Sequence, residues 1–567
     1  MRKQSTLPFV GLHAHSVAGS VFDGFGFPQE HMDFAYSNGM NALALTDHGN
    51  MNGLPYQVSH AKKMKEQDKD FKPIFGVEAY FIPSVEEWKD EYEKIKANKK
   101  EAKKLLSTTD KVSTEDESAS KRKSKNKINA RRHIVLLAQN QTGLNNIYKM
   151  VSKSHMGDNF YRYPRIDYAM LKEYGEGVMA SSACLGGVYA GDYWDNCIYE
   201  EYVDDAGNTK NRKVGEDEDA ILSAMRETTR RMQDALGDRW MGELQWNNVP
   251  EQHRLNKFVV KMHEEFGINI ISTADSHYPD KEAWKDRELY KRLGWIGTSK
   301  KQPEWMTSEL PIDVEEIGYE LYPKNGDEMY ESYKKYADEC GVEYDDELIK
   351  QSIVFTHHVA HNLIESFLPD DQVRLPSFIV PDGETATHTL TKSCIAGLRK
   401  LGLDKNEEYV ERLKFELGVI DDRGFSKYFL TMSAISDTAN QHMLSGPGRG
   451  SAAGSLVAYV LGITQVDPIK YGLLFSRFLR SDATDYPDID YDVSDAFGLK
   501  EILAEEWGET TVVPISNFNT LQLRSLIKDI GKFYKVPFTE VNAVTSRMVK
   551  EATPKAKKKH GITAGVY

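Results

Sequence analysis

Ligand-type side chains stand at the ends of successive short apolar segments in the first half of this chain. The segment 9–16 carries His13 and His15 two positions apart, and the apolar run 41–45 leads into an Asp-His pair that ends at His48. Residues two apart in a strand share a face, so the first two histidines can point at one ion. The alternation of apolar and helical segments predicts a parallel sheet or barrel, with functional residues at the carboxyl ends of its strands.

The same pattern recurs further along the chain, at the ends of segments 73–79, 133–138, 177–183 and 268–274. The candidate ligands on these segments are Glu78, His133, Cys184, Asp275 and His277. A lone histidine at a strand end is usually a packing or surface residue, but the recurrence on successive strands favours a shared site. Imidazole, carboxylate and thiolate together suit zinc, manganese or iron, and their number indicates two or three ions. Clustered metals can drive phosphoester hydrolysis.

Three short motifs, at 12–16, 46–49 and 274–277, resemble the polymerase and histidinol phosphatase (PHP) domain. The resemblance spans about residues 6–290 and implies a distorted α/β barrel with a trinuclear metal site. It implies Zn²⁺ or Mn²⁺/Fe²⁺ as the metals. The ligands that it implies are His13, His15, Asp23, His48, Glu78, His133, Cys184, Asp275 and His277.

Residues 84–132 interrupt this pattern with mixed-charge, lysine-rich sequence. Their composition favours a charged helix followed by a solvated loop. A basic arm that contacts a nucleic-acid backbone is the alternative.

The stretch 446–492 combines a small-residue loop with an Asp-x-Asp-x-Asp run that includes Asp488 and Asp490. Glycines allow close backbone approach to an anion, and we expect Ser451 to cap the helix 456–461. Two carboxylates on one strand face repel each other unless cations lie between them. The pairing of cradle and carboxylates therefore indicates chemistry on a triphosphate.

Motifs at 428–430, 446–455, 467–468, 474–479 and 487–492 resemble the bacterial and phage C family of replicative DNA polymerases, the DNA polymerase III alpha subunits. The family combines an N-terminal PHP domain with a palm like the polymerase-beta type of nucleotidyltransferase. The resemblance implies that Asp488 and Asp490 bind Mg²⁺ and catalyse nucleotidyl transfer. It implies that the incoming dNTP is held by Arg449, Gly450, Ser451 and Arg477.

Basic residues four apart follow at Arg524, Lys528 and Lys532, and share one helix face. This stripe suits DNA phosphates, although a solvated helix face explains it equally well. In the family, this region begins the thumb that grips primer–template DNA.

The resemblance also implies a third palm aspartate from a later segment, which the sequence does not reach. We therefore expect the N-terminal part of a split, intein-interrupted or truncated polymerase that works with a C-terminal polymerase fragment, and the compact size favours a phage-encoded form. The expected domains are a PHP phosphoesterase at 1–290, the first part of the palm at 291–515 and the start of the thumb at 516–567.

Composition limits the remaining alternatives. The net charge of −14 over 567 residues argues against a uniformly basic DNA binder, and four cysteines do not indicate a disulfide framework. With no membrane-length apolar run, a cytoplasmic protein without a membrane partner is expected. We predict a DNA polymerase portion with a PHP 3′–5′ exonuclease that proofreads. The alternatives are a stand-alone PHP exonuclease with an inert palm, and a scaffold with structural metals.

Overall fold

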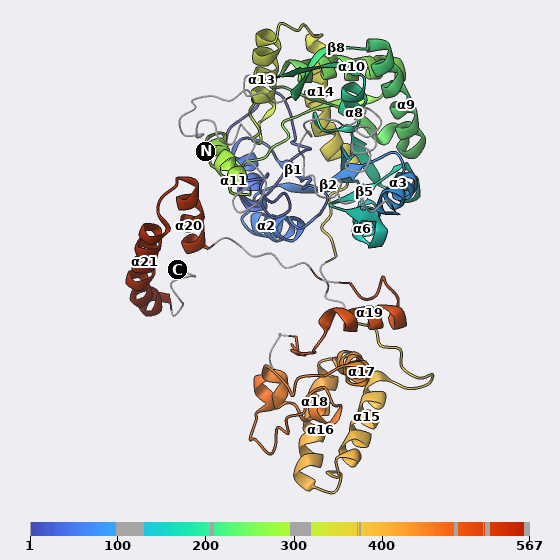
Figure 1. Ribbon diagram of the computed structural model, residues 1–567, viewed down its shortest axis with the longest axis vertical. Coiled ribbons are helices and arrows are strands. Elements are labelled where there is room, and N and C mark those ends of the chain that lie inside the picture. Colours follow the sequence, from blue (N-terminus) through green and yellow to red (C-terminus); the bar gives the residue numbers. More distant parts are fainter. Residues whose placement is uncertain are drawn as a thin grey trace. The chain divides into compact units, whose positions relative to one another are not determined.

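The computed structural model describes residues 2–97, 130–203, 209–294, 319–370, 372, 376–480, 486–513, 515 and 522–560. The chain forms two compact units, one of residues 1–369 with 521–567 and the other of residues 370–520 (Figure 1). These two units are defined by which residues pack together. The domains expected from the sequence are defined by function, and they stay predictions. Among the described residues, no helix is both long and apolar enough to span a membrane.

The first unit is built on one eight-stranded mixed sheet. Its strands run in the order β10-β9-β6-β3-β2-β5-β4, and β1 also pairs with β2. The bounds are β1 Ala42–Leu45, β2 Lys72–Phe81, β3 Arg132–Ala138, β4 Phe160–Tyr161, β5 Tyr163–Ile166, β6 Val178–Ser181, β9 Trp240–Gln245 and β10 Asn269–Thr273. Strand β3 is antiparallel to both β2 and β6, and β4 is antiparallel to β5. The expected parallel pairing holds for β1–β2, β2–β5, β6–β9 and β9–β10, and the sheet as a whole is mixed.

The segment that carries His13 and His15 closes this sheet. Gly11 forms a parallel bridge with Leu43 in β1, and Ala14 forms another with Ser276, just beyond β10. The His15 N–H also donates to Ser276 O at 2.7 Å. The curled sheet is the distorted α/β barrel expected from the sequence. The segment itself makes only isolated bridges, so the prediction of a regular strand at 9–16 is wrong.

Both faces of the central strands are buried. On β3, Ile134 and Leu136 belong to the larger hydrophobic cluster, while Val135 and Leu137 belong to a smaller one. His133 shares the face of the second pair, because side chains alternate along a strand. The candidate ligand therefore lies at the end of a buried strand face.

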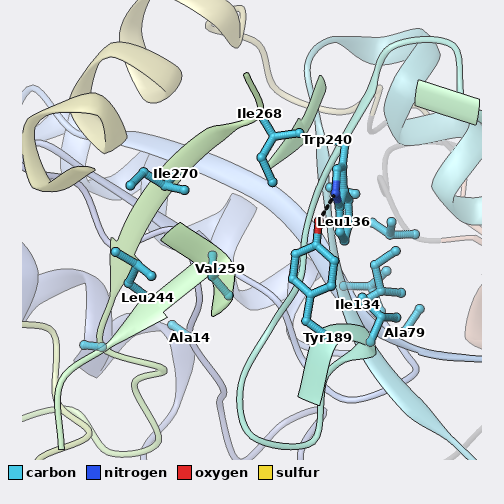
Figure 2. Packing of buried hydrophobic residues seen from close by; sticks show 14 of the residues in the cluster. Ala14, Ala79, Ile134, Leu136, Tyr189, Trp240, Leu244, Val259, Ile268 and Ile270 are labelled. Carbon is cyan, nitrogen blue, oxygen red and sulfur yellow. Dashed lines mark hydrogen bonds between the residues drawn. The ribbon is translucent and has the colours of Figure 1, made fainter. Parts of the chain in front are cut away.

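Helices cover the sheet of the first unit. They are α1 Pro28–Ser37, α2 Leu54–Glu66, α3 Val85–Ala97, α6 Gln141–His155, α7 Tyr168–Tyr174, α8 Val188–Asp195, α9 Glu218–Leu236, α10 Pro250–Phe266, α11 Trp284–Leu293, α13 Gly326–Glu339 and α14 Asp346–His358. Figure 2 shows the packing around Trp240, whose Nε1 donates to the Tyr189 hydroxyl on α8 at 2.9 Å. Of the charged insertion, α3 is a helix as predicted, and residues 98–129 lie outside the described residues.

Two smaller elements complete the first unit. A hairpin pairs β7 Cys197–Val203 with β8 Thr209–Glu216. Near the C-terminus, α20 Leu523–Phe533 packs on α21 Phe538–His560.

The second unit is helical in its described residues. Its α-helices are α15 Ala386–Lys400, α16 Glu407–Asp422, α17 Ser426–His442, α18 Leu456–Val460 and α19 Ala496–Trp507. A separate hydrophobic cluster, with Leu413, Phe429 and Leu456 among its members, packs α15 to α18 together, and α19 packs through Leu499 and Leu503 against Ala439 on α17. A single antiparallel bridge joins Ser445 to Val493. The fold class, a PHP-like α/β domain followed by a mainly helical region, is confirmed, and the likeness of this unit to a polymerase-beta palm stays a prediction.

Candidate metal centre

The nine residues proposed as metal ligands lie together in the first unit. They fall into three overlapping groups whose ligand atoms lie within 4.8 Å of one another: His13, His15, Glu78 and Asp275; His48, Glu78 and His133; and His15, His48 and His277. The other two candidates lie beside these groups. Asp23 Oδ2 is 3.1 Å from His48 Nε2, and Cys184 Sγ is 3.8 Å from His133 Nδ1.

Glu78 lies at the centre of the cluster and is fully buried on β2. Its Oε2 atom is 3.2 Å from His13 Nε2, 2.9 Å from His15 Nε2 and 3.1 Å from His48 Nδ1. Its Oε1 atom contacts His133 Nδ1. This carboxylate and the four imidazoles around it would hold metal ions, since both kinds of group are common metal ligands.

Hydrogen bonds on the far side of three imidazoles fix how those rings face the cluster. His277 Nδ1 donates to the carbonyl of Asp275 at 2.7 Å, and His13 Nδ1 lies 2.7 Å from the carboxylate of Glu243. His15 Nδ1 lies 3.2 Å from Ser20 Oγ. With Nδ1 protonated, each Nε2 keeps a lone pair for a metal.

Buried polar atoms without hydrogen bonds provide a test of whether the residues fit a cation. Asp275 Oδ1 lies within 3.4 Å of nitrogens of His13, His15 and His277 but forms no hydrogen bond among the described residues. Glu78 Oε1 and His48 Nδ1 are also buried without such a bond in this part of the chain. Unsatisfied buried donors and acceptors cost free energy. Their convergence with nitrogen, oxygen and sulfur ligands fits bound transition metals.

The charges in the cluster strongly perturb its pKa values. Burial alone would lower the pKa of His48, but the carboxylates of Glu78 and Asp23 outweigh it and raise that pKa to about 10. Burial would raise the pKa of Glu78, but the neighbouring imidazoles of His133 and His48 hold it well below its usual range. Burial, reinforced by the charges of Asp275 and Glu78, raises the pKa of the Cys184 thiol. Without a cation, protons on His13 and His48, whose pKa values are raised, balance part of the carboxylate charge.

The side chains of the cluster differ in how far they are exposed, and its edge at Asp23, His48 and His133 is the more open one. The side chains of His13, His15 and Glu78 have no exposed surface, whereas those of His48 and His133 are 14% and 20% exposed. The carboxylate of Asp23 is 39% exposed. A substrate would therefore reach the cluster over this edge.

Backbone strain accompanies the candidate ligands. Three residues other than glycine with positive φ are Asp275 (47°) and the residues just before Asp23 and Cys184, namely Phe22 (62°) and Ala183 (59°). Strain of this kind persists where the surrounding structure enforces it, and it is common at functional sites.

Sequence reasoning missed the groups that hold the ligands in place. Glu243 on β9 is buried and accepts from Ser181 Oγ at 2.5 Å, Thr273 Oγ1 at 2.6 Å and Gln245 Nε2 at 3.0 Å, besides its bond to His13. Arg287 on α11 donates to Asp23 Oδ1 at 2.5 Å. In the sequence, the only sign of the role of Glu243 is that a single charged residue stands within a mostly apolar segment.

In the second unit, the glycine loop lies beside the aspartate run. Gly446 N donates to Asp492 O at 2.9 Å, and Ser494 N donates to Leu444 O at 2.9 Å. Gly450 has φ +66°, and a Cβ there would lie 2.5 Å from Asp490 Oδ2. The loop and the carboxylate therefore touch only because residue 450 is glycine.

The other predicted palm residues are exposed. Arg449 pairs with Asp492 at 3.1 Å and lies 3.9 Å from Asp490, while Ser451 and Arg477 lie on short 3₁₀ turns. Asp488 is exposed as well. The structure brings Arg449, Gly450 and Asp490 together and gives no contact between Asp488 and the loop among the described residues.

The prediction that Ser451 caps the helix after the loop is wrong. Ser455 is the N-cap of α18 and accepts from Ala458 N at 3.2 Å. The buried carboxylate of Glu416 accepts from the N–H groups of Leu456 and Val457, both at 3.0 Å. A protein carboxylate therefore occupies this helix N-terminus, and an anion would have to bind at the preceding loop.

The basic stripe on α20 lies partly against α21. Arg524 donates to Ser546 Oγ at 3.4 Å, and the Lys528 ammonium lies 5.4 Å from the centre of the Phe538 ring. Lys532 pairs with Asp529 at 2.9 Å. A DNA-binding role for Arg524 and Lys528 stays a prediction.

Comparison with known proteins agrees with this division of the chain. A family model described as "PHP domain" matches residues 11–236, and one described as "Bacterial DNA polymerase III alpha NTPase domain" matches residues 388–564. The chain thus carries a PHP domain followed by a domain of the bacterial DNA polymerase III alpha type.

Curated relatives identify the family. DNA polymerase III subunit alpha of Aquifex aeolicus (strain VF5) is 30% identical over 543 residues, which cover 94% of this chain and 40% of the relative. The same subunit of Borreliella burgdorferi is 28% identical, and the match covers 95% of this chain and 40% of that relative. The chain belongs to the DNA polymerase III alpha subunit family and spans about 40% of the length of these relatives.

A solved two-domain protein from Bacteroides vulgatus, described as containing a predicted PHP-like metal-dependent phosphoesterase, is also similar. It is 12% identical with a TM-score of 0.24, and the match covers 50% of this chain and 60% of that one. A likeness this low has no bearing on function.

Proposed function

We propose that the first unit hydrolyses phosphodiester bonds at DNA ends as a metal-dependent 3′–5′ exonuclease, which proofreads for a replicative polymerase. The observation that supports this proposal is the convergence of imidazole, carboxylate and thiol groups around the buried Glu78. When bound, Zn²⁺, Mn²⁺ or Fe²⁺ would supply an activated water and neutralise charge on the phosphate.

In this proposal, the residues of the chain hold and orient that centre. The nine candidate ligands bind the metals, and Glu243 and Ser20 hold the rings of His13 and His15 so that each Nε2 faces inward. Arg287 holds Asp23 at the open edge. The buried walls exclude water from all other sides, so the phosphate is approached from that edge only.

The test is nucleotide release from a single-stranded oligonucleotide labelled at its 5′ end, with Mn²⁺ added to the full chain. A shortening ladder is expected, and chelation should abolish it until metal is restored. Asp275→Ala should lower the rate by about 10²-fold or more, the scale of losing one charged group from an active site. His388→Ala, which alters an exposed histidine of the second unit, should leave the rate unchanged. Undiminished cleavage by Asp275→Ala would refute the proposal.

We also propose that the second unit contributes to template-directed nucleotidyl transfer. The contact between Gly450 and Asp490, and the pairing of Arg449 with this aspartate run, favour it. Asp488 and Asp490 would bind Mg²⁺, while Arg449, Gly450, Ser451 and Arg477 would bind the dNTP. Arg524 and Lys528 would contact primer–template DNA. The resemblance implies a third aspartate from a later palm segment, so we propose that such a segment completes the site.

Primer extension with Mg²⁺ and dNTPs tests this second activity, with the chain alone and with a relative's later palm segment supplied in trans. We expect extension only in the supplemented reaction, and we expect Asp490→Asn to abolish it. Asp404→Asn, a change to another aspartate of the same unit, serves as the control. Equal extension by Asp490→Asn and the control would contradict the assignment.

A further inference from the structure

Phe22 combines two features that packing does not explain. Its φ of 62° is a conformation that bulky residues rarely adopt, and its side chain remains 41% exposed. The other two strained residues at the candidate ligands, Ala183 and Asp275, are 3% and 7% exposed. Strain at Phe22 is therefore not offset by full burial of its ring, and an observed outlier of this kind indicates a functional constraint.

Helix α11 holds Phe22 in this conformation. The Phe22 N–H donates to the Tyr290 hydroxyl at 3.2 Å, and the two ring centres are 5.2 Å apart at 32°. A Cβ on Gly294 would lie 2.7 Å from Phe22 Cγ, so the ring lies directly on that glycine. Arg287, Tyr290 and Gly294 are spaced three and four apart, so they share one face of the helix end. The ring is thus positioned before any ligand arrives.

The ring lies beside the open edge of the metal centre. Phe22 directly precedes Asp23, so their Cα atoms are about 3.8 Å apart. Asp23 is the most exposed carboxylate of the cluster, and Arg287 fixes it from the same helix face that holds the ring. A substrate whose phosphate reaches Asp23 therefore brings its neighbouring groups against Phe22.

We propose that Phe22, supported by Tyr290, is a stacking platform for the terminal nucleobase of an unpaired DNA strand end. This inference rests on the proposed phosphodiester hydrolysis and names the substrate that the site prefers. A nucleobase is the flat aromatic group that lies within a few ångströms of the terminal phosphodiester. Stacking needs a free base face at the strand end, so frayed and single-stranded ends bind, whereas a phosphomonoester without a base gains nothing. Base–aromatic stacking typically contributes about 5- to 100-fold per base.

Binding without metal tests the platform directly. The chelator-treated full chain is titrated with a single-stranded oligonucleotide that ends in 2-aminopurine, whose fluorescence falls on stacking. We expect quenching with the unchanged chain and its loss, with about 5-fold or more weaker binding, in Phe22→Leu. Phe160→Leu is the matched control, because Phe160 is 44% exposed elsewhere in the same unit. Equal quenching by Phe22→Leu and the control would overturn the proposal.

Cleavage kinetics separate failure of the platform from failure of the proposed function. One oligonucleotide ends in thymidine and the other in an abasic analogue, and both are assayed with Mn²⁺. The unchanged chain should cleave the thymidine end with a kcat/KM about 5- to 100-fold higher. Phe22→Leu should lose this preference and cleave the abasic end at the unchanged rate. Cleavage of neither end would reject the proposed function, whereas equal cleavage of both would reject the platform alone.

Phe22→Gly guards against a folding artefact. Glycine adopts positive φ without strain, which offsets part of the packing that is lost with the ring, so this variant should still unfold cooperatively in a thermal melt. It should still lose the preference for a terminal base. A preference that survives in Phe22→Gly would contradict the proposal.

Discussion

At the scale of single residues, the metal centre depends on groups that do not bind metal themselves. Glu243 is 1% exposed and accepts four hydrogen bonds, one of them from His13. A carboxylate behind a metal-binding imidazole fixes the tautomer and makes the ligand more basic. Glu243 would therefore act on a bound metal through His13.

Replacement of this carboxylate by a neutral amide should weaken metal binding. We expect Glu243→Gln to lower metal affinity about 10-fold or more, since the amide can still accept a hydrogen bond but carries no charge. The measurement is a titration of chelator-treated protein with Zn²⁺ or Mn²⁺.

Two further variants test whether the loss of affinity is specific to Glu243 and to its charge. Glu251→Gln changes a carboxylate in the first turn of α10 and should bind metal normally. Glu243→Asp should recover part of the affinity, because it restores the charge. If Glu243→Gln bound metal as tightly as the unchanged chain, Glu243 would be a core residue only.

The sequence predicted the ligands better than it predicted their supports. The candidate ligands stand in recognisable short motifs, and the barrel gathers the ends of its strands, so His13, Glu78 and Asp275 meet as their spacing indicates. Glu243 and Arg287 stand in no motif, and their partners are far away in the sequence. Only the folded chain shows these pairs.

At the scale of elements, irregular backbone explains where the predictions failed. The segment around His13 and His15 reads as a strand, and Ala14 between them is buried in the core as alternation requires (Figure 2). It nevertheless bridges two elements at single points, Gly11 with β1 and Ala14 beyond β10. The local sequence pattern indicates which side chains share a face. The bridge between Ala14 and Ser276, however, depends on residues more than 250 positions apart.

The loop before α18 shows the same limit. Ser451 and Ser455 are both suitable N-caps by residue type, and the sequence gives no reason to prefer the second. Glu416 on α16 decides the matter, because its buried carboxylate binds the first N–H groups of α18 together with the Ser455 hydroxyl at 2.9 Å. Arg412 stabilises this carboxylate from one turn earlier in α16, at 2.6 Å. Long-range contacts of this kind leave no periodic signal.

At the scale of the whole molecule, the two units have separate hydrophobic clusters, and all nine candidate ligands of the metal centre around Glu78 lie in the first unit. A ligand that binds only the folded form of one unit stabilises that unit alone. The two parts of the chain should therefore respond differently to metal.

We expect calorimetry of the chelator-treated chain to show two unfolding transitions, of which metal raises only one. At a free metal concentration 100-fold above Kd, the gain is about 2.7 kcal/mol, which corresponds to a shift of several degrees. With Zn²⁺ as the added metal, the transition of the second unit should stay in place, because none of the nine candidate ligands around Glu78 belongs to it. Asp275→Ala should remove the shift, whereas His388→Ala should keep it. A single transition, or an equal shift of both, would show that the units unfold together and that the separate cores do not set the stability of this chain.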